Sequence, residues 1–322
     1  MTKSIICLLG PTASGKSAVA LSMAKYFPIE IVSVDSALIY CGMDIGTAKP
    51  SCDEQKQVKH HLIDILDPSD AYSVAQFASD AHRICNDIFS RGKLPLLVGG
   101  TMLYFRALFQ PLSALPAANN EIRADIDKQA KELGWPALHQ QLAKIDIDSA
   151  QRIAANDTQR IQRALEVFLI TGKTLTELIN CSEKISHVET TGPDLHSSPY
   201  LIIKLFPSNR AWIHEKIEKR FDMMLAAGFL NEAAELHKNK QLNAHLPSMR
   251  CVGYRQAWQY FNGEYDMATF REKSIIATRQ LCKRQLTWLR SMPADYEIDC
   301  LSANQVDQIK AIMEKTYYSF SS

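Results

Sequence analysis

The chain has 322 residues, of which 46% are apolar, enough for one large hydrophobic core or for a core with a smaller inserted domain. Its 36 Lys+Arg and 35 Asp+Glu residues leave a net charge of +1. This balance excludes a nucleic-acid binder that acts through a basic field over its whole surface, so any such contact must come from a local patch. The eight cysteines include no CxxC pair, which argues against a zinc site or a disulfide framework.

Four short and almost continuously apolar runs, at residues 5–10, 29–36, 94–100 and 200–206, predict buried parallel strands. Helical spacing at 17–27 and 73–92 separates the first three runs, and Gly92 is suited to end the second helix. Alternating strands and helices favour an α/β fold with a parallel sheet. The first run is too short for a membrane span or a signal-peptide core, so we expect a cytoplasmic protein without membrane contact.

The pattern changes after Pro116, where polar helical stretches at 119–134, 136–145 and 156–172 replace the strands. The last stretch begins with Asn156 and Gln159 in a capping-box arrangement and ends at Gly172. A polar linker at 181–199 follows, and the sequence beyond 207 is mostly helical. We therefore expect a core made of 1–115 and 200–322, with an all-helical insertion at 116–199.

Residues 10–17 match the phosphate-loop pattern GxxxxGK[ST] between a predicted strand and a predicted helix, which is the context that the motif requires. Backbone amides and the helix N-terminus bind phosphate, a lysine adds charge, and a serine hydroxyl can bind Mg²⁺. The motif predicts phosphate or diphosphate binding on a core like that of P-loop NTPases, without saying which phosphate compound binds. Its residues are Gly10, Pro11, Thr12, Ala13, Ser14, Gly15, Lys16 and Ser17.

Polar residues follow two of the predicted strands. Asp35 ends the run at 29–36, where it can assist Mg²⁺ binding through water, act as a general base on an acceptor, or only cap the turn. Thr101 follows Gly99 and Gly100 after the third run, where it can bind substrate or cap a helix. Ligands of open parallel sheets bind at this edge, so both residues are candidates for the site.

A single-signed basic stretch at 271–290 contains six Lys/Arg residues and one acid, Glu272. Arg279 and Lys283 share a helical face, and Arg284 lies beside them. Such runs are usually solvated helix faces, but the absence of alternating charge favours RNA contact here. The adjacent His60 and His61 point to different sides of a strand or helix, which argues against a metal site.

Six blocks carry a family resemblance: GPTASGKS, SVDSALIYCGMDIGTAKP, LLVGGTMLYFRAL, NDTQRIQRALEVFLITGKTLTEL, RCVGYRQ and ATRQLCKRQLTWLR. In this order, and over nearly the whole chain, the sequence resembles the bacterial tRNA isopentenyltransferase family, the tRNA dimethylallyltransferases. The resemblance implies transfer of a dimethylallyl group from dimethylallyl diphosphate to N6 of the adenosine 3′ of the anticodon. It also implies the tRNA anticodon stem-loop as partner. With the phosphate-loop serine, we expect Mg²⁺ as cofactor, and we expect a monomeric protein.

The resemblance also implies roles for individual residues. Residues 10–17 would bind the diphosphate, with Mg²⁺ at Ser17, while Asp35 would be the general base on N6. Lys16, Thr101 and Arg220 would act on the reacting groups, with Arg220 as a diphosphate clamp. Many relatives have Gln in place of Leu38, so an apolar contact is expected there. Together with the predicted basic helix, the expected tRNA-contacting residues are Asp35, Ser36, Ala37, Leu38, Thr101, Arg123, Gln159, Arg160, Ile161, Gln162, Arg163, Arg250, Cys251, Val252, Gly253, Tyr254, Arg255, Arg279, Lys283 and Arg284.

Without the resemblance, the motifs indicate only a P-loop kinase or transferase. The alternative function is an ATP-dependent small-molecule kinase in which Asp35 is the base on a hydroxyl. A nucleotide-binding regulator without transfer chemistry is a third possibility. The kinase predicts ATP turnover without RNA, whereas the transferase predicts an RNA-dependent prenyl transfer that needs no ATP.

Overall fold

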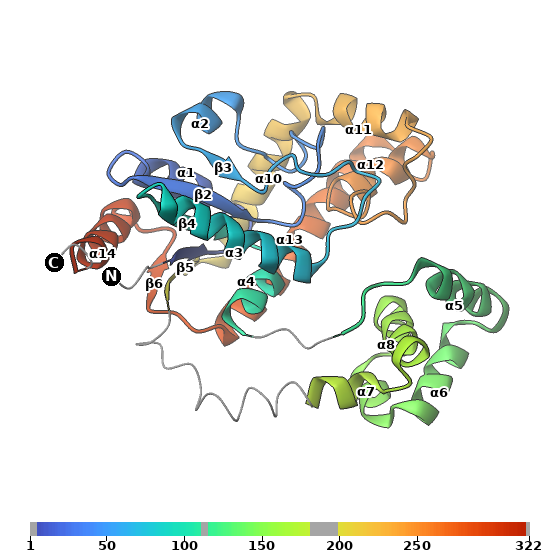
Figure 1. The fold of residues 1–322 in the computed structure, drawn as a ribbon. Helices are drawn as coiled ribbons and strands as arrows, with labels where there is room; N and C mark the ends of the chain where they lie inside the picture. Colours follow the sequence, from blue (N-terminus) through green and yellow to red (C-terminus); the bar gives the residue numbers. More distant parts are fainter. Residues whose placement is uncertain (1–4, 111–114, 181–198, 320–322) are drawn as a thin grey trace. The chain divides into compact units, whose positions relative to one another are not determined.

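A computed structural model describes residues 5–110, 115–180 and 199–319, with side chains to 317. The polar linker expected at 181–199 lies outside these ranges except for its last residue. The chain divides into two compact units, one made of Met1–Phe109 with Leu195–Ser322, the other of Gln110–Asp194 (Figure 1). No helix in the described ranges has the length and apolar character that crossing a bilayer requires.

The first unit is built on a parallel sheet whose order, within the described residues, is β3-β2-β4-β1-β5-β6. The strands at 5–10, 29–36, 94–100 and 200–206 are confirmed, the first three with slightly shorter ends. The sequence patterns did not predict β3 and β6, because these edge strands are short and not continuously apolar. The strands are β1 Ile5–Leu9, β2 Ile29–Val34, β3 His60–His61, β4 Leu94–Gly99, β5 Tyr200–Phe206 and β6 Tyr296–Asp299.

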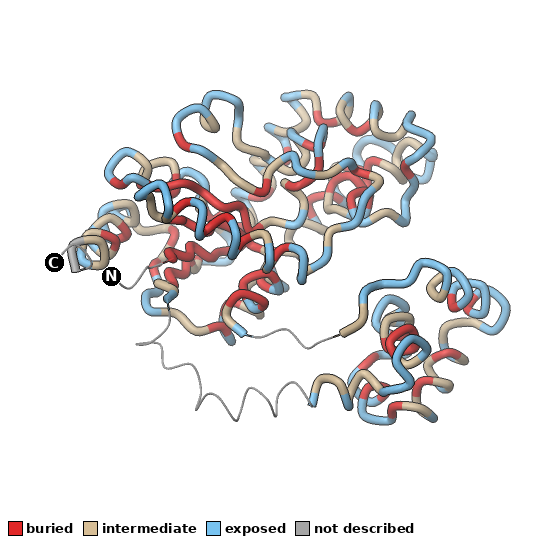
Figure 2. Tube along the Cα trace, viewed as in Figure 1, coloured by how far each residue is buried: buried red, intermediate tan, exposed pale blue. Residues whose placement is uncertain are grey.

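Helices cover both faces of this sheet, and buried residues run along its strands (Figure 2). Side chains alternate between the faces, so Cys7 and Leu9 pack with α3 and α4, while Ile6 and Leu8 pack with α1 and α14. A third cluster joins α10 to α13 with residues that follow β2. The helices of this unit are α1 Lys16–Met23, α2 Cys52–Gln57, α3 Val74–Ser90, α4 Met102–Phe109, α10 Arg210–Ala226, α11 Phe229–Lys238, α12 Tyr254–Phe261, α13 Met267–Ser291 and α14 Gln305–Ser319.

The regular secondary structure in the described residues of the second unit is all helical, and the unit has its own small core around Ile126, Leu138 and Ile161. The α/β core with a parallel sheet and the helical insertion are therefore confirmed, while the borders expected at 116 and 199 stay a prediction. The helices are α5 Asn120–Leu133, α6 Trp135–Ile145, α7 Ile147–Arg152 and α8 Thr158–Thr171, and residues 175–180 are also helical.

The ends of α8 test two local predictions. Gly172 follows the helix in a left-handed conformation with φ of 68°, as expected for a residue without a Cβ atom. The capping box expected from Asn156 is wrong by one residue, because Asp157 is the N-cap and its side chain accepts a hydrogen bond from the amide of Arg160. An aspartate satisfies a free amide of the first turn as well as asparagine does, so the sequence pattern alone does not separate the two.

Candidate active site

A cavity of about 580 Å³ lies in the first unit, beyond the carboxyl ends of β1, β2 and β4. This is the edge at which parallel α/β sheets bind their ligands. Its wall combines the phosphate loop, the turns after β2 and β4, helix α10, residues 247–253 and helix α13. The expected site residues that line it are Thr12, Lys16, Ser17, Asp35, Ser36, Ala37, Leu38, Thr101, Arg220, Arg250, Cys251, Val252, Gly253 and Arg284.

The phosphate loop connects the end of β1 to the start of α1. Gly15 is the N-cap of α1 with φ of 86°, a conformation that costs glycine little because it has no Cβ atom. The Lys16 amine donates a hydrogen bond to the Pro11 carbonyl at 2.5 Å, and the Ser14 hydroxyl donates to the same carbonyl at 2.9 Å. The loop therefore curls around its own lysine at the cavity wall.

Three charged groups that line the cavity, Lys16, Arg220 and Asp35, interact electrostatically. Burial lowers the pKa of Lys16 to about 8, and the positive charge of Arg220 acts in the same direction. Burial also lowers the pKa of Arg220, whereas the Asp35 carboxylate favours the charged forms of both cations. Two desolvated cations facing one carboxylate leave an excess of positive charge that suits a diphosphate.

Asp35 and Thr101 lie in the turns that follow the neighbouring strands β2 and β4. One carboxylate oxygen of Asp35 accepts a hydrogen bond from the amide of Ala37 at 2.9 Å, so this residue does cap the turn after β2. Its second oxygen has no hydrogen-bond donor among the described residues and is free to accept a proton. The Thr101 hydroxyl accepts from the amide of Ser36 at 3.1 Å, which ties the two turns together.

Gln285 on α13 also lines the cavity, and the sequence patterns did not single it out. Its side-chain carbonyl accepts a hydrogen bond from the Thr12 amide at 2.8 Å, and its amide group donates to the Gly100 carbonyl at 2.9 Å. A Cβ atom on Gly100 would lie 2.5 Å from this side chain, so the contact requires glycine there. One glutamine thus bridges the phosphate loop and the turn that carries Thr101.

Residues 250–255, expected to contact tRNA, divide between three environments. The first four line the cavity. Tyr254 is 2% exposed, and its hydroxyl donates to Glu232 at 2.5 Å, so its side chain is part of the core. Arg255 is exposed and lines a second cavity of about 530 Å³ beside α12 and α13.

The basic residues of α13 are not equivalent. Arg279 pairs with Glu218 of α10 at 3.1 Å, and Arg271 pairs with Glu218 at 3.0 Å and with Asp222 at 2.7 Å. Lys283 and Arg284 are exposed and have no acidic partner in the described part of the chain. Lys273 and Arg290 are likewise exposed without an ion pair in the described ranges. Of these uncompensated charges on α13, Arg284 is the one that lines the cavity.

In the second unit, two of the expected tRNA contacts share one buried carboxylate. Glu166 is 0% exposed, and it accepts from Arg123 at 2.9 Å and from Arg163 at 2.6 Å. Ile161 is also fully buried, so its side chain offers no surface to a partner. Gln159 and Arg160 are exposed on the same helix. Contact of these residues with tRNA stays a prediction, with Gln159 and Arg160 the most accessible.

No group of three or more His, Cys, Asp or Glu side chains in the described ranges is arranged to hold a metal ion. His61 lies 2.7 Å from Glu30, and the His60 ring lies 2.8 Å from the Val58 carbonyl, so both rings have protein partners. Ser17 borders the cavity beside Lys16. A hydroxyl at this position fits Mg²⁺, which binds to few protein ligands and completes its shell with phosphate oxygens and water.

Comparison with known proteins agrees with this architecture. The family described as IPP transferase matches residues 38–292. The tRNA dimethylallyltransferase of Ralstonia pickettii (strain 12J) is 54% identical over 318 residues, covering 98% of this chain and 96% of the relative. The enzyme of the same name from Burkholderia lata is 52% identical over 314 residues, covering 96% and 95%.

Two solved structures share the fold. The tRNA isopentenylpyrophosphate transferase of Bacillus halodurans is 30% identical, with a TM-score of 0.70, and the match covers 99% of this chain and 98% of that one. A eukaryotic dimethylallyltransferase that acts on tRNA is 25% identical, with a TM-score of 0.79, over 98% of this chain and 80% of that one. The extent of these matches, together with the phosphate loop at the sheet edge, shows that the chain belongs to the tRNA dimethylallyltransferase family of IPP transferases.

Proposed function

We propose that the protein transfers the dimethylallyl group of dimethylallyl diphosphate to N6 of the adenosine 3′ of the anticodon in tRNA. The observation that carries this proposal is that Lys16, Arg220 and Asp35 line one cavity and interact electrostatically, in a member of a family of tRNA prenyltransferases. Lys16 and Arg220 would bind the diphosphate, and the Asp35 carboxylate would contact the nucleophile. The cavity wall also includes Phe221, Leu281 and Trp288, which suit a five-carbon apolar group.

In the proposed reaction, N6 attacks the first carbon of the dimethylallyl group, and the bond from that carbon to the diphosphate oxygen breaks. The electron pair leaves with the diphosphate, whose growing negative charge Lys16, Arg220 and the loop amides stabilise. The proton of N6 passes to Asp35, whose second oxygen is available to accept it. Adenine N6 is a weak nucleophile, so holding it in line with the leaving group contributes as well.

Ser17 is the residue that would hold Mg²⁺, and the bound ion supplies further positive charge to the leaving diphosphate. The target base is stacked in the anticodon loop and must turn out of the stack to enter the cavity. Lys283, Arg284 and the exposed residues of α8 are the proposed contacts to the RNA backbone, which positions the tRNA without reading its sequence. The protein would work as a cytoplasmic monomer.

Labelled dimethylallyl diphosphate and bulk tRNA, incubated with the protein with and without ATP, test the proposal against the kinase. We expect the label in tRNA, at a rate that ATP does not change. ATP turnover in the absence of RNA, with no label in tRNA, would support the kinase instead.

A further inference from the structure

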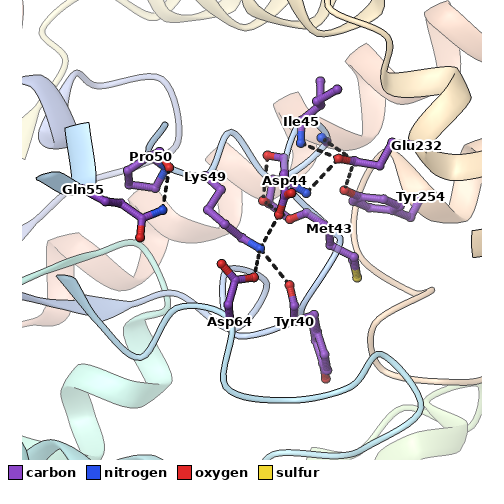
Figure 3. A network of polar contacts seen from close by, with 12 residues as sticks. Tyr40, Met43, Asp44, Ile45, Lys49, Pro50, Gln55, Asp64, Glu232 and Tyr254 are labelled. Atoms are coloured by element: carbon purple, nitrogen blue, oxygen red, sulfur yellow. Dashed lines mark hydrogen bonds and ion pairs between the residues drawn. The ribbon is translucent and has the colours of Figure 1, made fainter. Parts of the chain in front are cut away.

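Glu232 of α11 places its carboxylate within a turn of backbone amides (Figure 3). One oxygen accepts hydrogen bonds from the amides of Asp44 and Ile45 at 2.9 and 2.7 Å. The other accepts from the Gly46 amide at 3.0 Å and from the Tyr254 hydroxyl at 2.5 Å. Four donors fill the acceptor capacity of a carboxylate, so the side chain is held in one orientation.

The segment that Glu232 holds is part of the cavity wall. Gly46, Thr47 and Ala48 line the cavity, and the Thr47 carbonyl accepts a hydrogen bond from Arg220 at 3.4 Å. That distance is at the long end of the hydrogen-bond range, so the contact depends on where the carbonyl lies. The arginine proposed to bind the diphosphate thus contacts a backbone segment, and Glu232 holds the residue directly before that contact, Gly46.

The backbone conformation of residues 44–49 costs free energy and therefore needs stabilising contacts. Ala48 has φ of 52°, in the left-handed region that side chains with a Cβ atom disfavour. At Gly46 a Cβ atom would lie 2.3 Å from the Phe229 ring, so the backbone approaches the core as closely as it can. Lys49 fixes the far end, because its amine donates to the Tyr40 carbonyl at 2.8 Å and to Asp44 at 2.6 Å (Figure 3).

We propose that Glu232 is a positioning residue for diphosphate binding, which acts on Arg220 through the backbone of residues 44–47. The same carboxylate accepts a hydrogen bond from Tyr254, whose neighbours 250–253 also line the cavity, so one side chain connects two segments next to the cavity wall. This role rests on the proposed function for its substrate, but the binding of inorganic diphosphate tests it separately.

The test is the affinity of the full-length protein for inorganic diphosphate, measured by calorimetry. Glu232→Gln keeps the shape but replaces one accepting oxygen with a donor, so two donors lose their partner. We expect the dissociation constant to rise roughly tenfold, in line with the loss of hydrogen bonds to a charged group. Glu235→Gln, on the same helix and paired only with the exposed Lys238, is the matched control and should bind as the wild type does.

A double-mutant cycle distinguishes an effect of Glu232 on the position of Arg220 from a general destabilisation of the cavity wall. If Glu232 acts through Arg220, its substitution should add little to the effect of Arg220→Lys on diphosphate affinity. Full additivity of the two losses would overturn the proposal, as would a Glu232→Gln protein with wild-type affinity.

Should Glu232→Gln not fold, Tyr254→Phe gives the same test more gently, because it removes one of the four donors and leaves the carboxylate. We expect a two- to fivefold loss of diphosphate affinity, the scale of one hydrogen bond. Tyr265→Phe, which removes the hydroxyl that donates to Gln259, should leave the affinity unchanged. Equal affinities of the two tyrosine variants would overturn the proposal. Wild-type protein that binds diphosphate but transfers nothing to tRNA would instead contradict the proposed function alone.

Discussion

The Thr12 amide of the phosphate loop donates a hydrogen bond to the side-chain carbonyl of Gln285, 2.8 Å away and 273 residues further along the chain. Gln285 lies next to Arg284, an exposed basic residue without an acidic partner in the described part of the chain. Helix α13 therefore presents charge on its surface and holds the phosphate loop with the next side chain. This hydrogen bond connects the loop that would bind the diphosphate to the helix that would contact the RNA.

Replacing Gln285 should slow transfer more than it weakens tRNA binding. Gln285→Leu removes both hydrogen bonds, to Thr12 and to Gly100, so the phosphate loop loses its tie to the turn of Thr101. We expect the single-turnover rate to fall by roughly ten- to a hundredfold, the scale of two lost hydrogen bonds in a desolvated site. Gln280→Ala, an exposed glutamine on the same helix, is the control. Equal rates for the two variants would show that the bridge does not contribute.

The lowered pKa of Lys16 gives diphosphate binding a pH dependence. Burial and Arg220 bring this pKa to about 8, so above that pH the empty site holds a neutral amine, and a bound anion draws a proton onto it. Affinity for inorganic diphosphate should therefore fall as pH rises through about 8. Calorimetry at pH about 8.5 in buffers of different ionisation enthalpy should show proton uptake, reduced in Lys16→Arg because arginine stays charged. The same uptake in both proteins would assign the proton to the ligand instead.

The cations of α13 should differ in their effect on the salt dependence of tRNA binding. Lys283→Ala and Arg284→Ala each remove an uncompensated charge, so each should lower the salt slope of log affinity by roughly one unit or slightly less. Arg279→Ala should have a smaller effect, because Glu218 already compensates part of its charge. Arg271→Ala is the control, since two carboxylates hold that residue. Unchanged slopes at 283 and 284 would place the RNA contacts elsewhere, with Gln159 and Arg160 the next to examine.

Asp35 should control the chemical step. Asp35→Asn keeps the turn but removes the group that accepts the N6 proton, so the single-turnover rate should fall roughly 10²–10⁴-fold. The loss should shrink as pH rises, because an external base can then take the proton. Asp87→Asn, at an exposed aspartate of α3 outside the cavity, is the matched control and should retain wild-type activity. A wild-type rate in Asp35→Asn would leave this residue as a turn cap only.

Sequence patterns predicted those parts of the fold whose residues are adjacent in the chain, namely the buried strands and the phosphate loop. The strands β1, β2, β4 and β5 are buried on both faces and therefore read as continuous apolar runs. The edge strand His60–His61 has neither the length nor the composition of such a run, and it was not predicted. The phosphate loop was predicted because its amides and its lysine must be adjacent in sequence.

The contacts of Gln285 and Glu232 could not be read from the sequence. Gln285 reaches Thr12 across 273 residues, and Glu232 reaches Asp44 across 188, so neither leaves a local pattern. The burial of Tyr254 and Ile161 was missed for a related reason, because a short motif that resembles an RNA-contacting segment does not tell which of its side chains face the core.

The most direct test of the central claim is to identify the modified nucleoside in tRNA that lacks the modification. Wild-type protein, dimethylallyl diphosphate and this tRNA are incubated, and the products are digested and analysed by mass spectrometry. We expect N6-dimethylallyladenosine in the anticodon-loop fragment, at the position 3′ of the anticodon. Lys16→Ala should bind the tRNA as tightly as wild type and leave this nucleoside almost absent. A dimethylallyl group at another site, or equal yields from wild type and Lys16→Ala, would contradict the account.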